Sequence, residues 1–171
     1  MRWTTRPETA RDAGAIRAVV AAAFPTVQEA DLVDALREDA AWVPGLSVVA
    51  ETPDGRVAGH ALLTRCTVGG EAALALAPVA VLPEFQRRGA GASAVRAGLD
   101  AAAGRAAAGA ERLVVVLGHP EYYPRFGFVR ASGLGVTAPF QVPDEALMAL
   151  VLDGPGPVPS GTVGYPAPFG V

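Results

Sequence analysis

The chain has 171 residues, 51% of them hydrophobic, and a formal net charge of −3 at pH 7. This length is typical of one domain with a sizeable core, and the hydrophobic fraction excludes a disordered chain. The negative charge argues against a nucleic-acid-binding protein with a broad basic face, although it leaves room for a local phosphate pocket.

A single cysteine, Cys66, excludes an internal disulfide and with it a secreted, disulfide-rich scaffold. The N-terminal residues lack the apolar stretch of a signal peptide. The longest apolar runs, such as Val19–Phe24 and Leu113–Leu117, are too short to cross a bilayer. We therefore expect a cytoplasmic protein with no membrane or nucleic-acid partner.

The first forty residues are predicted to form a short strand and two helices. Trp3–Arg6 reads as a strand, and Thr9 with Asp12 three residues later has the form of a capping box at a helix start. Apolar residues then recur at helical spacing, and a second helix is predicted over Gln28–Glu38. The helical residues expected to face the core are Ile16, Val19, Val20, Phe24, Leu32, Val33 and Leu36.

Three consecutive strands are predicted next, over Leu46–Glu51, Val57–Val68 and Glu71–Leu82. Asp54-Gly55 and Gly69-Gly70 are tight-turn sequences that separate them. Strands joined by such short turns run antiparallel, so this part of the chain is predicted to be an antiparallel meander.

An alanine-rich helix is predicted over Ala90–Ala108, followed by a β-branched, buried strand over Leu113–Leu117. The strand–helix–strand connection from Val79 to Leu117 requires that its two strands run parallel. We therefore predict an α+β fold, in which a mixed, mostly antiparallel sheet with one parallel junction is flanked by helices.

Residues 1–152 are predicted to form a single domain. From Asp153 onward ten of nineteen residues are Gly or Pro, so residues 153–171 are predicted to be an irregular tail that packs on this domain or stays loose. Glu145–Leu152 could be a strand that pairs across a homodimer.

The segment PEFQRRGAGASA, residues 83–94, has the composition of an anion-binding turn. A P-loop needs Lys-Ser/Thr after its last glycine, whereas Gly91 is followed by Ala92-Ser93. A dinucleotide fingerprint fits by spacing, with Glu111 as the ribose-binding acid. However, Leu82–Arg88 separate the glycines from their strand, and Glu111 precedes the next strand instead of following it. We therefore treat this match as coincidental.

The remaining interpretations are a loop that merely turns a corner and a cradle for a pyrophosphate. Gly89 and Gly91 permit close backbone approach, and the free amides at the start of the helix point at an anion. Arg87 and Arg88 add positive charge beside them. Motif, strand and helix follow one another in the order that a pyrophosphate cradle requires.

With Gln86, Gly89 and Gly91, the segment resembles the acetyl-CoA motif Gln/Arg-x-x-Gly-x-Gly/Ala of the GNAT superfamily of N-acetyltransferases. The preceding LALAPVAVLP resembles that family's central strand, which bulges and splays from its neighbour to admit the pantetheine arm. Pro78 fits independently, because a proline inside a strand marks a bulge or a missing ladder bond. The chain as a whole resembles a bacterial branch of predicted acetyltransferases.

The resemblance implies the acyl-CoA N-acyltransferase fold with splayed central strands, and acetyl-CoA as cosubstrate. The residues that it implies for cofactor binding are Val79, Ala80, Val81, Gln86, Arg87, Arg88, Gly89, Ala90, Gly91, Ala92 and Ser93. In the implied mechanism an amine attacks the thioester directly, and a backbone N–H near Val79 or Ala80 stabilises the oxyanion. No metal is implied.

A second motif, HPEYYPRFGF, covers residues 119–128. Tyr123 precedes Gly127-Phe128 at the spacing found in GNAT enzymes, so by resemblance it is the general acid that protonates the coenzyme A thiolate. A phenol with a pKa near 10 is protonated at neutral pH. The alternative is a core aromatic beside the neighbouring phenylalanines. Many family members have an asparagine and a longer helix before this tyrosine, whereas here Pro124 should limit the helix to about one turn.

A base must deprotonate the amine, and His119 has a suitable unperturbed pKa and follows a buried strand. Glu84 and Glu121 could act instead through water, and any of these three could be a surface residue. His60 is more simply a hydrogen-bonded histidine on a strand, and Cys66 a small buried thiol. The acceptor is open: a small-molecule amine, or the amine of a peptide or protein. A sensor that binds acyl-CoA without turnover is the second hypothesis.

Overall fold

The computed structural model describes residues 2–171, and the chain divides into two compact units. The first comprises residues up to Leu63 together with Pro78–Ala101. The second comprises Thr64–Ala77 together with Ala102–Val171. Two strands and one helix continue across these boundaries, so each unit contains part of them.

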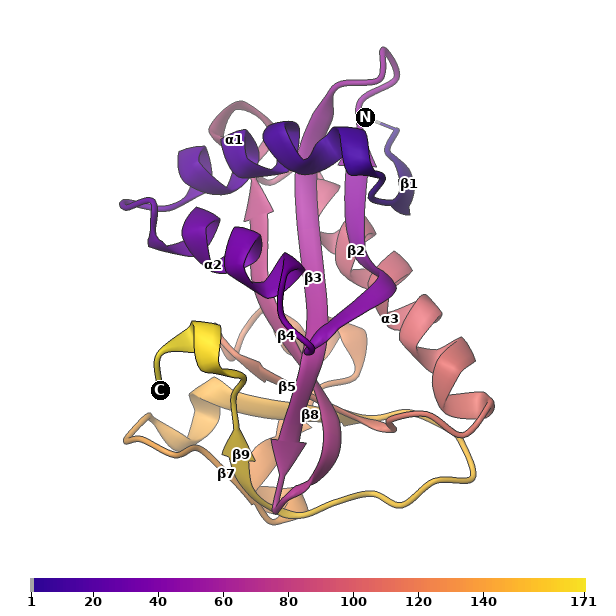
Figure 1. The fold of residues 1–171 in the computed structure, drawn as a ribbon, viewed down its shortest axis with the longest axis vertical. Coiled ribbons are helices and arrows are strands. Elements are labelled where there is room, and N and C mark those ends of the chain that lie inside the picture. The colour runs from indigo at the N-terminus through magenta and orange to yellow at the C-terminus, as the bar shows by residue number, and fades with distance from the viewer. Residues whose placement is uncertain (1) are drawn as a thin grey trace. The chain divides into compact units, whose positions relative to one another are not determined.

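The first unit consists of helices and a four-stranded part of the sheet (Figure 1). Its elements are β1 (Thr4–Pro7), a 3-10 turn (Ala10–Asp12), α1 (Ala13–Ala23), α2 (Gln28–Arg37), β2 (Trp42–Glu51), the start of β3 (Val57–Val68), the end of β4 (Glu71–Val81) and the start of α3 (Ala90–Ala107). The strands lie in the order β1-β2-β3-β4, and β1 pairs antiparallel with β2.

The predicted capping box is present at the start of the first helical segment. The Thr9 N–H donates to Asp12 Oδ2 at 2.6 Å, and the Asp12 N–H donates back to the Thr9 carbonyl at 3.0 Å. Arg6 also donates to both Asp12 oxygens, at 2.7 and 3.0 Å. The first turn is 3-10, and the α-helix begins only at Ala13.

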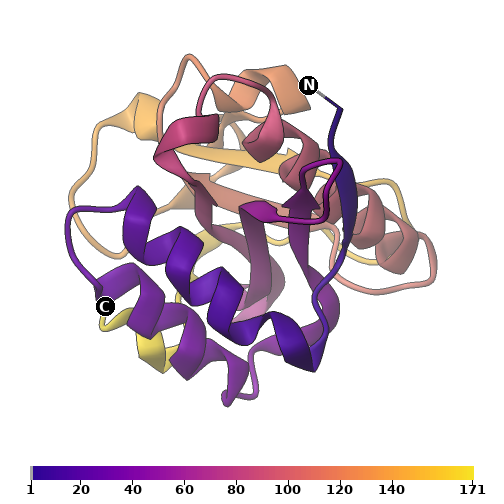
Figure 2. The ribbon, with the colours of Figure 1, turned by 90° about the horizontal axis from the view of Figure 1, so that it is seen from above.

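Helices cover both faces of β2 and β3 in this unit, as Figure 2 shows from above. On one face, a Cβ at Gly98 of α3 would lie 3.3 Å from Leu63 and 3.9 Å from Val48. The opposite face carries Ser47 and His60, because side chains of a strand alternate between its faces. Residues Ala58–Thr64 are therefore buried without interruption, which is typical of a strand covered on both sides.

His60 of β3 is fully buried in this unit. Its Nε2 lies 2.8 Å from the Ser47 Oγ, which in turn hydrogen-bonds the Glu8 carboxylate, and Arg37 donates to the same carboxylate. Its Nδ1 has no recorded hydrogen-bond partner among the described residues. Burial, with a smaller contribution from the Arg37 charge, lowers the pKa of His60 to about 3. The predicted strand histidine is therefore confirmed, and it is neutral at pH 7.

The pKa of His60 makes the stability of the fold sensitive to acid. The pKa of His60 is lowered from 6.5 to about 3 in the folded chain. Between pH 6.5 and pH 3 this histidine is therefore protonated in the unfolded chain and neutral in the folded chain. Stability from this group is complete above pH 6.5 and falls as the pH drops toward 3. We expect the free energy of unfolding to fall by roughly 2–3 kcal/mol between pH 7 and pH 4.5 through this group. Denaturant titrations at both pH values measure the change, which His60→Gln should remove and His119→Gln should leave in place.

The second unit contains the other end of the sheet. Its elements are the end of β3, the start of β4, the end of α3, β5 (Leu113–Leu117), a 3-10 turn (Tyr123–Phe126), β6 (Val129–Arg130), β7 (Val136–Thr137), β8 (Leu147–Val151) and β9 (Gly161–Gly164). The strands lie in the order β3-β4-β5-β8-β6, and β9 pairs with both β3 and β7. The predicted parallel junction is confirmed, because Leu74 and Ala75 of β4 pair in parallel with Val114 and Val115 of β5.

The tail departs from its prediction, because part of it is a strand. Strand β9 pairs antiparallel with β3 through Thr67↔Gly164 and Val68↔Val163, and parallel with β7. The sheet therefore has a second parallel pair that was not predicted. Glycine is required here, since a Cβ at Gly161 would lie 2.7 Å from the Gly69 Cα. Strands of two to four residues are too short to show an alternating pattern.

The segment considered for pairing across a dimer is a strand within the sheet. Strand β8 pairs antiparallel with β5 from Leu113↔Val151 to Leu117↔Leu147, and with β6 on its other side. Both edges of β8 are thus occupied within the chain. In the part of the chain that the structure describes, every helix is too short or too polar to span a membrane.

Candidate functional site

The glycine-rich turn of the first unit leads directly into helix α3. The Ser93 N–H donates to the Gly89 carbonyl at 2.9 Å, which is the first hydrogen bond of the helix. The N–H groups of Ala90, Gly91 and Ala92 therefore have no acceptor inside the helix. Together with the partial positive charge of the helix N-terminus, these three donors make a site suited to a phosphate.

The backbone before this helix adopts an unusual conformation. Arg87 has φ 61°, the one positive φ among the non-glycine residues 2–171, and Gly89 has φ 90°. A left-handed conformation at arginine costs roughly 1–2 kcal/mol, and such strain is frequent where a loop is shaped for a ligand. The segment Gln86–Gly89 is exposed, and neither Arg87 nor Arg88 takes part in a recorded ion pair within the described chain. Their charges are available to an anion.

Trp3 holds this loop in place, a role that the sequence analysis missed. Its Nε1 donates to the Arg88 carbonyl at 2.7 Å, and its ring packs edge to face against Phe85 at 5.7 Å. Trp3 and Arg88 are 85 residues apart, so no local pattern relates them. Gln86 makes a longer contact, from Nε2 to the Val81 carbonyl at 3.5 Å.

In the second unit, strands β4 and β5 separate after a short ladder. Their parallel pairing consists of Leu74↔Val114 and Ala75↔Val115, and no further pair between them is recorded in the described chain. Both strands nevertheless continue, β5 as far as Leu117. Beyond Ala77, strand β4 belongs to the first unit and continues with Pro78, which has no N–H to donate. The predicted splayed strands are therefore present.

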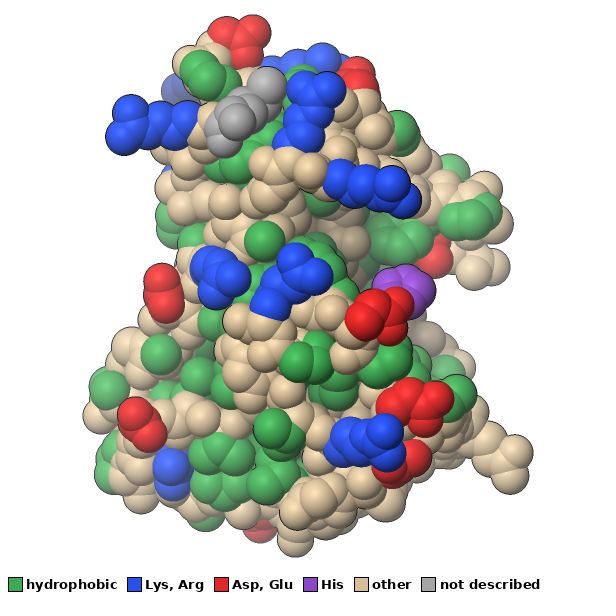
Figure 3. Space-filling view, turned by 180° about the vertical axis from the view of Figure 1, so that it is seen from behind, with side chains coloured by type: hydrophobic (Ala, Val, Ile, Leu, Met, Phe, Trp, Pro, Cys, Tyr) green, Lys and Arg blue, Asp and Glu red, His purple; other side chains and the backbone are tan. Residues whose placement is uncertain are grey.

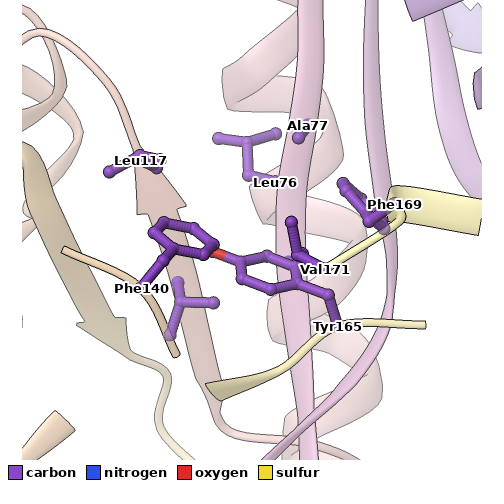
Figure 4. A pocket seen from close by; sticks show the side chains of 9 residues that line it. Leu76, Ala77, Leu117, Phe140, Tyr165, Phe169 and Val171 are labelled. Atoms are coloured by element: carbon purple, nitrogen blue, oxygen red, sulfur yellow. The ribbon is translucent and has the colours of Figure 1, made fainter. Parts of the chain in front are cut away.

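A cavity of about 240 Å³ opens in this unit where the two strands separate (Figure 4). Strand β4 lines it with Ala75, Leu76 and Ala77, and strand β5 lines it with Val115 and Leu117. The remaining lining side chains come from later in the chain and are Phe140, Tyr165, Phe169 and Val171.

Tyr123 packs in an aromatic cluster just after β5. Its ring centroid lies 5.0 Å from that of Tyr122 and 5.9 Å from that of Phe128, in both cases edge to face. Its ring also covers Gly118 so closely that a Cβ there would overlap it. Burial, with a smaller effect of Tyr122, raises the pKa of Tyr123 to about 12. The phenol is therefore protonated at neutral pH, and its packing allows both the role of an acid and that of a core aromatic.

Residues 14–128, which include the glycine-rich turn, the splayed strands and Tyr123, match the model of the acetyltransferase (GNAT) family. The chain belongs to the GNAT family. Among curated relatives, it is 41% identical over 139 residues to the uncharacterized N-acetyltransferase YjhQ of Escherichia coli, covering 78% of this chain and 74% of the relative. The suspected family is thus confirmed.

Solved GNAT structures share the fold over the full length of the chain. The Escherichia coli protein YhbS, crystallised with CoA, superposes with a TM-score of 0.87 at 29% identity, covering 100% of this chain and 93% of that one. An acetyltransferase from Brucella melitensis in complex with acetyl-CoA has a TM-score of 0.78 at 35% identity, with 98% of each chain covered. The predicted GNAT fold, with its mixed, mostly antiparallel sheet, is therefore confirmed.

The remaining candidate residues of this GNAT protein fall into two groups. His119 is 85% exposed, with its Nδ1 3.9 Å from the Glu121 carboxylate, so its role as a base stays a prediction. Cys66 is buried, and burial raises the pKa of its thiol to about 12, which confirms a structural thiol. Glu111 forms ion pairs with Arg105 at 2.7 Å and Arg65 at 3.4 Å.

Basic residues do not form a broad surface on the face of the described chain that Figure 3 shows. On the face shown in Figure 3, arginine side chains stand singly or in small groups among apolar, polar and acidic ones. This distribution agrees with the net charge of −3.

Proposed function

We propose that this protein transfers an acetyl group from acetyl-CoA to a primary amine. The observation that carries the proposal is the turn of the first unit, where an exposed loop with a left-handed Arg87 and a second arginine leads into a helix whose first three amides have no acceptor inside the helix. The supporting comparison is the Brucella melitensis acetyltransferase, which was crystallised with acetyl-CoA.

The turn would bind the pyrophosphate of acetyl-CoA. The amides of Ala90, Gly91 and Ala92 would donate to phosphate oxygens, and the guanidinium groups of Arg87 and Arg88 would neutralise their charge. Gly89 would keep the backbone clear of a side chain that blocks this approach. Gln86 and Ser93 flank these donors, and Trp3 would keep the loop in its binding conformation through the Arg88 carbonyl.

Backbone N–H groups and a phenol would carry out the acetyl transfer. The amine nitrogen would form the new C–N bond, and the thioester C–S bond would break to release the coenzyme A thiolate. Backbone N–H groups of Val79 or Ala80 would stabilise the oxyanion, with Val81 continuing the same strand. Tyr123 would donate its proton or a hydrogen bond to the thiolate. His119 is the proposed base for the amine, and the reaction would take place in the cytoplasm.

An acyl-CoA sensor without turnover is the second candidate. It is favoured by one observation: a side chain as exposed as that of His119 is not held in place for proton abstraction. The two candidates share the anion site and differ only in whether thiol is released.

The test combines ligand binding with turnover. Acetyl-CoA and CoA at a hundred times their Kd are expected to stabilise the fold by about 2.7 kcal/mol, roughly 5–10 °C in Tm, whereas NAD should not. Thiol release in the presence of a panel of primary amines then measures turnover. Stabilisation by NAD but not by CoA would contradict the anion-site assignment, and binding without thiol release would favour the sensor.

A further inference from the structure

The cavity of the second unit is lined mainly by apolar side chains. None of the side chains that line it is charged, and the Tyr165 phenol is the one polar side chain among them. Its volume is about 240 Å³, whereas a cavity of roughly 150 Å³ suffices for benzene. It therefore has room for an aromatic ring or a branched aliphatic group with a few further atoms.

Aromatic residues from the last third of the chain form one wall of this cavity. The Phe140 and Tyr165 rings stack with their centroids 6.1 Å apart, and Phe169 lies 5.1 Å from Tyr165. Figure 4 shows the Tyr165 hydroxyl directed toward the Phe140 ring. Burial raises the pKa of Tyr165 to about 12, so this wall carries no charge at neutral pH.

The cavity lies at the same end of β5 as Tyr123. Leu117, the last residue of β5, lines the cavity, and the next residue, Gly118, is covered by the Tyr123 ring. Two consecutive residues of the second unit, Leu117 and Gly118, therefore contact the cavity and the Tyr123 ring respectively. This placement connects the cavity to the acetyl-transfer chemistry proposed for Tyr123.

We propose that this cavity holds the apolar part of the acceptor, which is a small primary amine carrying an aromatic ring or a branched aliphatic chain. The inference rests on the proposed function and specifies its substrate class. Acceptors with several charges or hydroxyl groups are disfavoured, because lining side chains that are almost all apolar offer few partners to their polar atoms. Phe140, Tyr165 and Phe169 are the residues that set this specificity.

The first test compares kcat/KM for three primary amines with acetyl-CoA: 2-phenylethylamine, 3-methylbutylamine and ethanolamine. We expect kcat/KM for each of the two apolar amines to exceed that for ethanolamine by at least about tenfold. A single methylene group in a hydrophobic pocket already changes kcat/KM by roughly 10- to 200-fold. Equal or higher efficiency with ethanolamine would overturn the inference while leaving acetyl transfer intact.

A cavity-filling variant tests whether the preference for apolar amines comes from this cavity. Val171 lines the cavity and is 66% exposed, so Val171→Trp can fill the space without disturbing the core. The matched control is Val158→Trp, at a residue of the same unit that is 41% exposed and does not line the cavity. We expect the first variant to lose the preference for apolar amines and the second to keep it. A preference that survives in both would overturn the inference.

Two further outcomes separate this inference from the proposed function. If no amine is acetylated, the proposed function is wrong, and the inference about the cavity is then tested by binding. Saturation-transfer NMR of 2-phenylethylamine with the CoA-bound protein measures that binding. Binding that Val171→Trp abolishes and Val158→Trp retains supports it, and absence of binding to the unmodified protein overturns it. If Val171→Trp instead changes the choice between acetyl-CoA and longer acyl-CoA thioesters but not between amines, the cavity holds the acyl chain and the inference is wrong.

Discussion

Gly89→Glu is expected to reduce the affinity for acetyl-CoA by at least about a hundredfold, or roughly 2.7 kcal/mol, and to leave the protein folded. The new carboxylate would stand beside the amides proposed to bind the pyrophosphate and would repel it. Gly89 also has φ 90°, so any side chain there strains the loop. A Cβ would meet nothing closer than Trp3 Nε1 at 3.8 Å, so the core is not disturbed. Isothermal titration with acetyl-CoA measures the loss.

Gly45→Glu is the matched control for backbone strain and charge. Gly45 belongs to the same unit, also has φ 90°, and a Cβ there meets no atom within 4 Å. Both substitutions therefore carry a similar cost in folding free energy, roughly 1–2 kcal/mol. Only Gly89→Glu should lose affinity. An equal loss in both variants would show that the effect comes from destabilisation, and unchanged affinity in Gly89→Glu would remove the turn from the binding site.

Tyr123→Phe is expected to lower kcat by about a hundredfold or more with little change in KM for acetyl-CoA, because positioned acids contribute roughly 10²–10⁴-fold. The phenol, with its pKa raised to about 12, is a weak acid beside a thiol of pKa about 8.5. Its contribution would therefore come largely from a hydrogen bond to the developing thiolate. Phenylalanine keeps the edge-to-face contacts with Tyr122 and Phe128. Steady-state thiol release measures the effect.

Tyr122→Phe is the neighbouring control. It removes one hydroxyl from the same aromatic cluster and keeps its ring contacts with Tyr123 and with Phe126, whose centroid lies 5.5 Å away. Its kcat should stay within about threefold of the unmodified protein, because the role proposed for Tyr123 is absent there. Undiminished turnover in Tyr123→Phe would leave this tyrosine as a core aromatic. Equal losses in both variants would point to disturbed packing of the cluster.

The local features of the chain were readable in its sequence. The capping box at Thr9 and the turns at Asp54-Gly55 and Gly69-Gly70 depend on residues within a few positions of one another, and all are present. The parallel junction between β4 and β5 was predictable for a different reason, because a helix between two strands of one sheet permits no other direction.

The missed features all depend on contacts between distant parts of the chain. Trp3 reaches Arg88 across 85 residues, and β9 pairs with β3 although its four residues show no period. Tyr165 and Phe169 in a Gly/Pro-rich tail were the one available signal, since aromatic rings are seldom left without packing partners.

The amino-acid sequence alone determined the order of the elements as far as β5, the GNAT resemblance and the position of the candidate anion-binding turn, because periodicity, turn residues and a short motif are all local. The tertiary structure decided the rest: that β4 and β5 separate after two residue pairs, and that the tail returns to line the cavity beside them. The physical reason is that a cavity exists only where chain segments far apart in sequence pack incompletely, and no local pattern encodes that packing.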